Sequence, residues 1–384
     1  MKKIAIIGTG GLASVYARRC EELGIESHCF SWGPCPDTGV FDFYHEISIT
    51  EVAAIADICR ALGIAGVIPT TEATFLPAAR IASELGLNGN PVEVAAGISN
   101  KYRNREAVSS LNCVKQPRYW RLADVHDVCS IDCDFPIIIK PTSEAGKRGV
   151  SVVKNSQDLD SAIAYSESEP NRSHEVIVEE LLPWSPEYCV ESLSFHGKNY
   201  IIQVTQKDID NGPHCAELGH HQPAELPTFM RKRVEDAIDA ILTATGIQNG
   251  PCCTEIRLIG DDIYFIELNA RAGGDFVAYP LAELSTGYPY ITGIIEAALD
   301  ELNPIDTSAF EKNYAGVCFV TSQTKDLESL FEKCQDYDWC YAKHEVSKDL
   351  KALTHNDASK QNYFTYYSKT ARPVTPRFGW SSGN

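Results

Sequence analysis

The stretch TEIRLIGDDIYFIELNARAGGD, residues 254–275, is the segment from which the rest of the chain is interpreted. Two apolar runs flank a short polar turn, a pattern that predicts a β-hairpin. In the second strand, Glu267 and Asn269 are two residues apart, so their side chains share one face. A three-residue turn at 260–262 would place Glu255 directly opposite Glu267, whereas a two-residue turn would put the two carboxylates on opposite faces.

This pair of opposed carboxylates predicts a cation site. Like charges placed directly opposite each other destabilise a sheet by roughly 0.2–1 kcal/mol, and a divalent cation between them reverses the sign. Ile263 and Phe265 are expected to be buried on the same face as the carboxylates, which argues against a solvated strand. Two carboxylates and an amide oxygen suit Mg²⁺, so the candidate metal ligands are Glu255, Glu267 and Asn269.

A second segment, IIIKPTSEAGKRGV at 137–150, has the features of a phosphate site. Lys140 ends an almost continuous apolar strand, and a buried ammonium group needs an anionic partner. The loop that follows contains Gly146, Lys147 and Arg148. Exposed backbone N–H groups and positive charges in a loop of this kind suit a polyphosphate.

Between these two segments, residues 176–193 read VIVEELLPWSPEYCVESL. The strand ends in Glu179 and Glu180 and continues into Leu182, so it would offer backbone groups and apolar side chains to an adenine. Glu187, a few residues further on, is a candidate for binding ribose hydroxyls.

The first hundred residues alternate strands and helices, which predicts a parallel sheet covered by helices. Gly8-Thr9-Gly10-Gly11 follows the first strand in the manner of a dinucleotide-binding fingerprint. The sixth position is Ala13, however, and the second strand runs into His28-Cys29-Phe30-Ser31-Trp32 without the carboxylate that such sites use. A structural turn in which helix and strand pack closely is the better interpretation.

The chain is expected to have the α/β fold class, with α+β architecture in its later parts. The pattern predicts an α/β domain over residues 1–100, a small α+β lid over 101–182, and a larger α+β domain over 183–384 that carries the metal site. Residues 306–384 form a C-terminal extension without a motif. Residues 207–228 are expected to be a long irregular segment, and loops of that length are usually functional.

Composition excludes several classes of protein. The 384 residues carry a formal net charge of -18, and an acidic surface repels a phosphate backbone, so no nucleic-acid partner is expected. No apolar stretch reaches about 18 residues, so no membrane partner is expected. The 14 cysteines lack metal-binding spacing and predict free thiols in a reducing compartment, and we expect a cytoplasmic protein.

The order of these segments resembles the ATP-grasp superfamily from the N-terminus to about residue 300. Lys101 in SNKYRNREAV follows the N-terminal α/β domain, and the resemblance is most specific in ELNARAGGD. It implies an ATP-grasp architecture with ATP and two Mg²⁺ ions, which Mn²⁺ can replace, as cofactors. It implies that the nucleotide contacts Lys101, Lys140, Gly146, Lys147, Glu179, Glu180, Leu182 and Glu187, and that the metal ions contact Glu255, Glu267 and Asn269.

Within that superfamily, the chain is most similar to carboxylate–amine ligases that join two L-amino acids. Glu217 and His220 are three residues apart in GPHCAELGHHQPAEL, a spacing that similar ligases use in the substrate pocket. The resemblance implies substrate contacts from Glu72, Glu217, His220, Arg271 and Gly274, and catalytic roles for Lys140, His220 and Arg271.

The resulting hypothesis is a reaction between a small-molecule carboxylate and a small-molecule amine. ATP phosphorylates the carboxylate, the amine attacks the acyl phosphate, and an amide or dipeptide forms with ADP and phosphate. Arg271 would stabilise the oxyanion, and His220 would accept a proton.

Three alternatives stay open. The scaffold could carboxylate its substrate through carboxyphosphate, or it could load an amino acid on a carrier protein. An NAD-dependent oxidoreductase is the alternative from another class, and the missing carboxylate after the second strand argues against it. The resemblance is also compatible with a homodimer.

Overall fold

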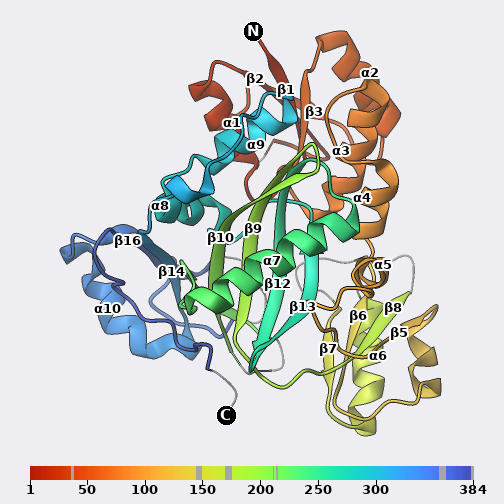
Figure 1. Ribbon diagram of the computed structural model, residues 1–384, viewed down its shortest axis with the longest axis vertical. Helices are drawn as coiled ribbons and strands as arrows, with labels where there is room; N and C mark the ends of the chain where they lie inside the picture. The colour runs from red at the N-terminus through yellow and green to blue at the C-terminus, as the bar shows by residue number, and fades with distance from the viewer. Residues whose placement is uncertain are drawn as a thin grey trace.

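Three β-sheets organise the chain (Figure 1). The computed structural model describes residues 1–35, 39–143, 149–168, 175–210, 212, 215–353 and 360–381. Among these residues, no helix is long and apolar enough to span a membrane, and the 13 cysteines whose side chains are described have free thiols. Each sheet lies within one of the three predicted segments, and the predicted α/β class with antiparallel later sheets is confirmed.

The N-terminal sheet is parallel, as the alternation of strands and helices predicts. In sheet order its strands are β3 (Phe43–Glu46), β2 (Glu26–Ser31), β1 (Lys3–Ile7) and β4 (Gly66–Pro69). Its helices are α1 (Ala13–Glu22), α2 (Val52–Leu62), α3 (Glu72–Leu85) and α4 (Val92–Ile98). The sequence pattern misses β3 because this short edge strand is half exposed and lacks an apolar run.

The glycine loop after β1 is a close-packed turn. Gly8 has a φ of +90°, and a Cβ atom there would lie 2.7 Å from Thr74 Cγ2 and 2.8 Å from Thr70 Oγ1. Thr70 Oγ1 also donates a hydrogen bond to the Ile7 carbonyl oxygen at 2.9 Å. The start of α3 therefore packs directly on the loop, which is the role that the structural interpretation of these glycines predicts.

The second sheet is small and antiparallel. In sheet order its strands are β5 (Tyr119–Leu122), β8 (Val176–Glu180), β6 (Ile137–Pro141) and β7 (Ser151–Val153). Helix α6 (Leu159–Ser168) packs on it, and α5 (Lys101–Ala107) precedes it. The N-cap of α5 is Asn100, whose side chain accepts a hydrogen bond from the Arg103 N–H at 3.0 Å, so Lys101 is the first residue of that helix.

The third sheet is large and antiparallel, and it crosses the middle of the molecule (Figure 1). In sheet order its strands are β13 (Asp262–Asn269), β12 (Gly250–Ile259), β9 (Glu187–Phe195), β10 (Lys198–Ile209), β11 (Glu217–Gln222), β14 (Tyr314–Val320), β16 (Asn362–Ser368) and β15 (Cys340–His344). The two predicted hairpins, β9–β10 and β12–β13, are confirmed. The C-terminal extension adds the last three strands of the sheet.

The expectation of a long irregular segment over 207–228 is wrong. Strand β10 continues to Ile209, and β11 occupies Glu217–Gln222. Polar residues in these strands, including His220 and His221, are fully buried. Because both faces of β11 are covered, its sequence does not alternate between apolar and polar residues, and the usual strand signal is missing.

Helices cover the large sheet on both sides. Helix α7 (Thr228–Thr245) lies across β10, β9, β12 and β13 (Figure 1), and its apolar side chains form a core with one face of these strands. The remaining helices are α8 (Glu283–Thr286), α9 (Tyr290–Ala298) and α10 (Glu328–Lys333), with a π-helical turn at Val277–Ala282. Short 3₁₀ turns lie at Val125–Ser130, Ser156–Asp158, Thr307–Ala309, Ser322–Leu327 and Cys334–Asp336.

The close approach of α3 to the glycine loop predicts the effect of a small substitution. Gly8→Ala should lower the free energy of unfolding by roughly 1–3 kcal/mol, because it combines a positive φ with a steric overlap. Gly24→Ala is the matched control, since Gly24 also has a positive φ (+67°) but nothing within 4 Å. Urea denaturation measures both variants. Equal losses in the two variants would show that the contact with α3 does not matter.

Candidate functional site

The two carboxylates of the predicted metal site face each other because the β12–β13 pairing contains a β-bulge. Ile259 pairs with Asp262, so the turn is two residues long and the expected three-residue turn is wrong. On its own, this turn would put the carboxylates on opposite faces. One extra residue, Ile266, shifts the register, and Glu255 pairs directly with Glu267. Glu255 and Glu267 therefore face each other as predicted, but the bulge brings them together and not a three-residue turn.

The same bulge corrects a second expectation. Ile263 and Phe265 are buried, but they lie in the core beneath α7, together with Leu268. They do not share the face of Glu267, because the extra residue reverses the alternation between Phe265 and Glu267. Asn269 follows Leu268 and lies on the face of Glu267. We call the face of the large sheet opposite α7 the site face.

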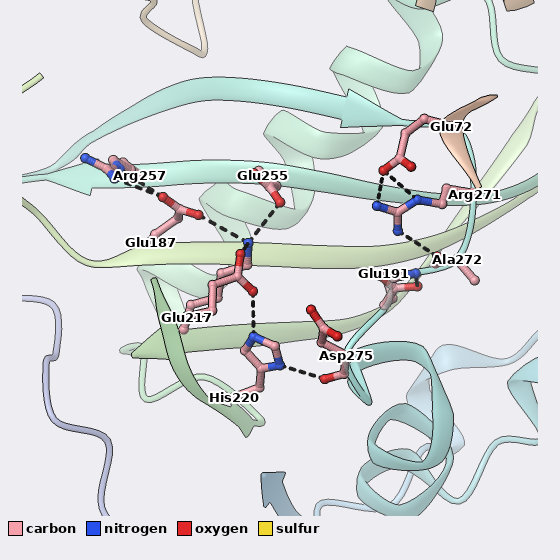
Figure 2. A network of polar contacts seen from close by, with 12 residues as sticks. Glu72, Glu187, Glu191, Glu217, His220, Glu255, Arg257, Arg271, Ala272 and Asp275 are labelled. Atoms are coloured by element: carbon pink, nitrogen blue, oxygen red, sulfur yellow. Dashed lines mark hydrogen bonds and ion pairs between the residues drawn. The ribbon is translucent and has the colours of Figure 1, made fainter. Parts of the chain in front are cut away.

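A second bulge brings Glu217 and His220 together. Two residues three apart in a regular strand point to opposite faces. In the β10–β11 pairing, Lys207 pairs with His220 and Ile209 with Glu217, which leaves Leu218 as the extra residue. Both side chains therefore lie on the site face, and His220 Nε2 is 2.9 Å from Glu217 Oε2. The other ring nitrogen of His220, Nδ1, lies 2.9 Å from the backbone carbonyl oxygen of Asp275 (Figure 2).

Lys207, which sequence reasoning missed, is the centre of the site face. Its ammonium group donates to Glu255 at 2.9 Å and to Glu187 and Glu217 at 3.2 Å each. Oxygens of these three carboxylates lie within 4.8 Å of one another, and Glu187 also accepts a hydrogen bond from Arg257 at 3.0 Å (Figure 2). Burial alone would lower the pKa of Lys207, but the negative charges of Glu217, Glu255 and Glu187 raise it well above its ordinary value.

A register shift also explains why Lys207 was missed. The turn of the β9–β10 hairpin by itself would pair Lys207 with Pro186. An extra residue at Ile202 moves Lys207 opposite Glu187 instead. The surrounding sequence QVTQKDI has the polar pattern of a solvated strand. The signal that could have identified Lys207 is the opposing Glu187. That opposition depends on the bulge.

Two of the predicted phosphate-binding lysines, Lys101 and Lys140, each contact a carboxylate. Lys140 Nζ donates to Glu179 at 2.8 Å, which is the anionic partner that the sequence predicts. Arg105, which sequence reasoning missed, donates to the same carboxylate at 2.5 Å. Burial alone would raise the pKa of Glu179, but Arg105 and Lys140 lower it to about 2. Lys101 Nζ donates to Glu267 at 2.7 Å, so one predicted phosphate residue contacts one predicted metal ligand.

The other residues predicted to contact the nucleotide are Glu180, Leu182, Gly146 and Lys147. Glu180 is partly exposed and lies 3.5 Å from the Arg118 guanidinium, while Leu182 is half buried in the linker that leads to β9. Gly146 and Lys147 lie outside the described residues. Helix α5 supplies Lys101 to the predicted nucleotide and metal site, and the large and small sheets together supply Lys140, Glu179, Glu187, Glu255, Glu267 and Asn269.

Arg271 and Glu72 form an ion pair between the loop that follows β13 and the first turn of α3. Thr71 and Thr74 form a capping box at the start of α3, which fixes Glu72 in its first turn. Arg271 Nε donates to Glu72 Oε1 at 2.8 Å, and Arg271 Nη1 donates to the Ala272 carbonyl oxygen at 2.9 Å (Figure 2). Burial alone would lower the pKa of Arg271, but Glu72 raises it above its ordinary value.

Glu191, another residue that sequence reasoning missed, holds the loop after β13. It is fully buried, and both of its carboxylate oxygens accept from the Gly273 N–H at 3.1 Å. A Cβ atom at residue 273 would overlap this carboxylate, so the contact requires glycine. The loop between Arg271 and Asp275, which includes Gly274, is thereby fixed beside His220. Burial raises the pKa of Glu191 to about 7.

The donor atoms on this face define what it can bind. Glu255, Glu267 and Asn269 offer oxygen ligands only, which suits Mg²⁺ or Mn²⁺. Lys101 and Lys140 offer positive charge to phosphate oxygens. The same region also contains the carboxylate–imidazole pair Glu217–His220 and the carboxylate–guanidinium pair Glu72–Arg271 (Figure 2).

The raised pKa of Glu191 predicts a pH-dependent stability. The folded protein keeps a proton on this carboxyl up to about pH 7, whereas the unfolded chain loses it near pH 4.5, so folding becomes less favourable as the pH rises between these values. Glu191→Gln removes this loss, which amounts to roughly 3 kcal/mol. Urea denaturation between pH 5 and 8 should show the wild type losing stability relative to the variant. Parallel profiles would contradict the assignment, and the exposed Glu93→Gln variant is the control.

Comparisons with known proteins agree with this geometry. Residues 133–279 match the family model described as an ATP-grasp domain. A formate-dependent phosphoribosylglycinamide formyltransferase from Sodalis glossinidius is 24% identical over 287 residues, which are 70% of this chain and 69% of the relative. The L-amino acid ligase from Bacillus licheniformis superposes with a TM-score of 0.81 at 20% identity and covers 96% of this chain and 94% of its own.

A second similar structure contains nucleotide and metal. It is the biotin carboxylase domain dimer of the 2-oxoglutarate carboxylase from Hydrogenobacter thermophilus, in complex with MgADP and bicarbonate. It has a TM-score of 0.73 at 18% identity and covers 96% of this chain and 86% of its own. The family match shows an ATP-grasp domain at residues 133–279, and the likeness to the solved structures shows that the chain shares their mixed α/β fold.

Proposed function

We propose that the protein is an ATP-dependent carboxylate–amine ligase that activates an amino acid as an acyl phosphate and couples it to an amine. The products would be an amide or a dipeptide, ADP and phosphate. One observation supports this proposal best. The pairs Glu217–His220 and Glu72–Arg271 lie beside two of the predicted metal ligands, Glu255 and Glu267.

The nucleotide half of the proposed site consists of Lys101, Lys140, Glu179, Glu187, Glu255, Glu267 and Asn269. Glu255, Glu267 and Asn269 would hold Mg²⁺, which neutralises charge on the transferred phosphoryl group when it is bound. Lys101 and Lys140 would exchange their carboxylate partners for phosphate oxygens. Phosphoryl transfer requires mainly positioning and charge stabilisation, and these residues supply both.

The substrate half consists of Glu72, Glu217, His220, Arg271 and Asp275, and its charges suit a zwitterion. The carboxylates attract an ammonium group, and the planar Arg271 fork suits a carboxylate or a developing oxyanion. Asp275 lies close enough to Glu217 for the negative charge of Glu217 to raise the pKa of Asp275, in addition to a larger effect of burial. An amino acid carries both of the groups that this half would recognise.

Both ring nitrogens of His220 face an oxygen atom. Nδ1 lies 2.9 Å from the Asp275 carbonyl oxygen, and Nε2 lies 2.9 Å from Glu217 Oε2. In the proposed reaction His220 would accept the proton of the attacking amine, and Glu217 would hold the imidazole ring in place. His220 is therefore a proton acceptor that works together with Glu217.

Formyl transfer to a phosphoribosyl substrate is the second candidate, and the 24% identical relatives favour it. Formate is also a carboxylate, so the nucleotide half would act in the same way. The substrate half argues against this candidate, since a phosphate group would lie near Glu72, Glu217 and Asp275 and meet their negative charges.

An ADP-release screen tests the proposed function. Pairs of L-amino acids, amino acids with other amines, formate and bicarbonate are each supplied with ATP and Mg²⁺, and the products are identified by mass spectrometry. We expect ADP release that depends on an amino acid, and a product with the mass of an amide or dipeptide. Release with formate or bicarbonate, and none with amino acids, would contradict the proposal.

Arg271 should matter for ligation more than for nucleotide binding. Arg271→Ala removes the group proposed to stabilise the oxyanion, a loss that in other acyl-transfer sites costs roughly 100- to 1,000-fold in kcat. Its affinity for ATP, measured by calorimetry, should stay near that of the wild type. Arg271→Lys keeps the charge but not the planar fork, so it should recover little activity. Equal losses of ATP affinity and turnover would instead make Arg271 a nucleotide residue.

A further inference from the structure

Lys207 contacts both halves of the proposed site. Glu187 and Glu255 belong to the nucleotide half, Glu217 belongs to the substrate half, and the Lys207 ammonium donates to all three. The lysine side chain is 4% exposed, so these contacts take place away from bulk water. None of the roles assigned above uses this residue.

The three carboxylates are arranged as ligands of one small cation. Their oxygens lie within 4.8 Å of one another. Oxygens bound to a single Mg²⁺, Mn²⁺ or Ca²⁺ ion at about 2.0–2.6 Å are separated by no more than about 5 Å. An ammonium group has three N–H donors, and Lys207 has three carboxylate acceptors, so its donors match this cluster one to one. Lys207 therefore occupies the position that a divalent cation would take.

We propose that Lys207 is a built-in cation that keeps divalent metal ions out of the carboxylate cluster until the nucleotide arrives. The inference rests on the proposed function, since it assigns the entering metal to an ATP site. Glu255 carries the coupling, because it contacts Lys207 and is also paired with Glu267 in the predicted metal site. A metal ion that arrives without phosphate must compete with a tethered ammonium group, whereas one that arrives with ATP brings phosphate oxygens for the displaced ammonium.

The charge balance of the cluster supports this role. Glu187, Glu217 and Glu255 contribute three negative charges, and Lys207 and Arg257 contribute two positive charges. Without Lys207, Glu187 still contacts Arg257 and Glu217 still contacts His220, but neither of these side chains donates to Glu255. Glu255 would then gain most from a metal ion.

Manganese binding without nucleotide tests the proposal. Lys207→Met removes the charge and keeps most of the side-chain volume, and free Mn²⁺ is measured by electron paramagnetic resonance on the metal-stripped protein. We expect Lys207→Met to bind Mn²⁺ at least about tenfold more tightly than the wild type, because an uncompensated carboxylate cluster attracts a cation strongly. Equal Mn²⁺ affinities in the two proteins would overturn the proposal.

Two further variants control for charge and folding. Lys198→Met removes an exposed lysine from the start of the same strand and should leave Mn²⁺ affinity unchanged. Lys207→Met/Glu217→Gln removes one charge of each sign and should bind Mn²⁺ more weakly than Lys207→Met. If Lys207→Met folds only in the presence of Mn²⁺, as measured by circular dichroism, the ion replaces the ammonium and the proposal holds. A variant that Mn²⁺ does not restore to the folded state would contradict it.

These measurements separate the inference from the proposed function. Mn²⁺ binding is measured without ATP or substrates, and the ADP-release screen uses the wild type alone. A wild type that ligates amino acids, together with unchanged Mn²⁺ affinity in Lys207→Met, would remove the role of Lys207 and leave the ligase proposal intact.

Discussion

A β-strand presents only every second side chain to one face of a sheet, and the site depends on three interruptions of that rule. Ile202, Leu218 and Ile266 each add one residue to a strand of the large sheet. These bulges align Lys207 with Glu187, Glu217 with His220, and Glu255 with Glu267. With regular pairing, the same residues would be divided between the site face and the core beneath α7.

The bulges explain how one sheet joins the proposed nucleotide half and the proposed substrate half. Lys207 lies at the junction and contacts carboxylates of both. Elements outside the sheet complete the arrangement: the first turn of α3 supplies Glu72, and Glu191 fixes the loop that carries Arg271. A glycine at residue 273 is required there because its N–H approaches the buried Glu191 carboxylate closely.

The sequence predicts those features that repeat with the period of a strand or a helix. The parallel N-terminal sheet, the two hairpins and an anionic partner for Lys140 all follow from such patterns. Strand β11 could not be predicted because its polar residues are buried on both faces. Lys207 could not be predicted because its partner Glu187 depends on a bulge, and a bulge leaves no mark in the composition of a strand. The opposition of Glu255 and Glu267 was predicted from a turn of the wrong length.

The most direct test of the account follows an oxygen atom of the substrate. An amino acid labelled with ¹⁸O in its carboxylate is turned over with ATP and an amine, and the inorganic phosphate is analysed by mass spectrometry. If the carboxylate attacks the γ-phosphate and the amine then displaces phosphate, one labelled oxygen appears in phosphate for each ADP formed. Amide formation with unlabelled phosphate would contradict the acyl-phosphate route and the function that we propose for the site face.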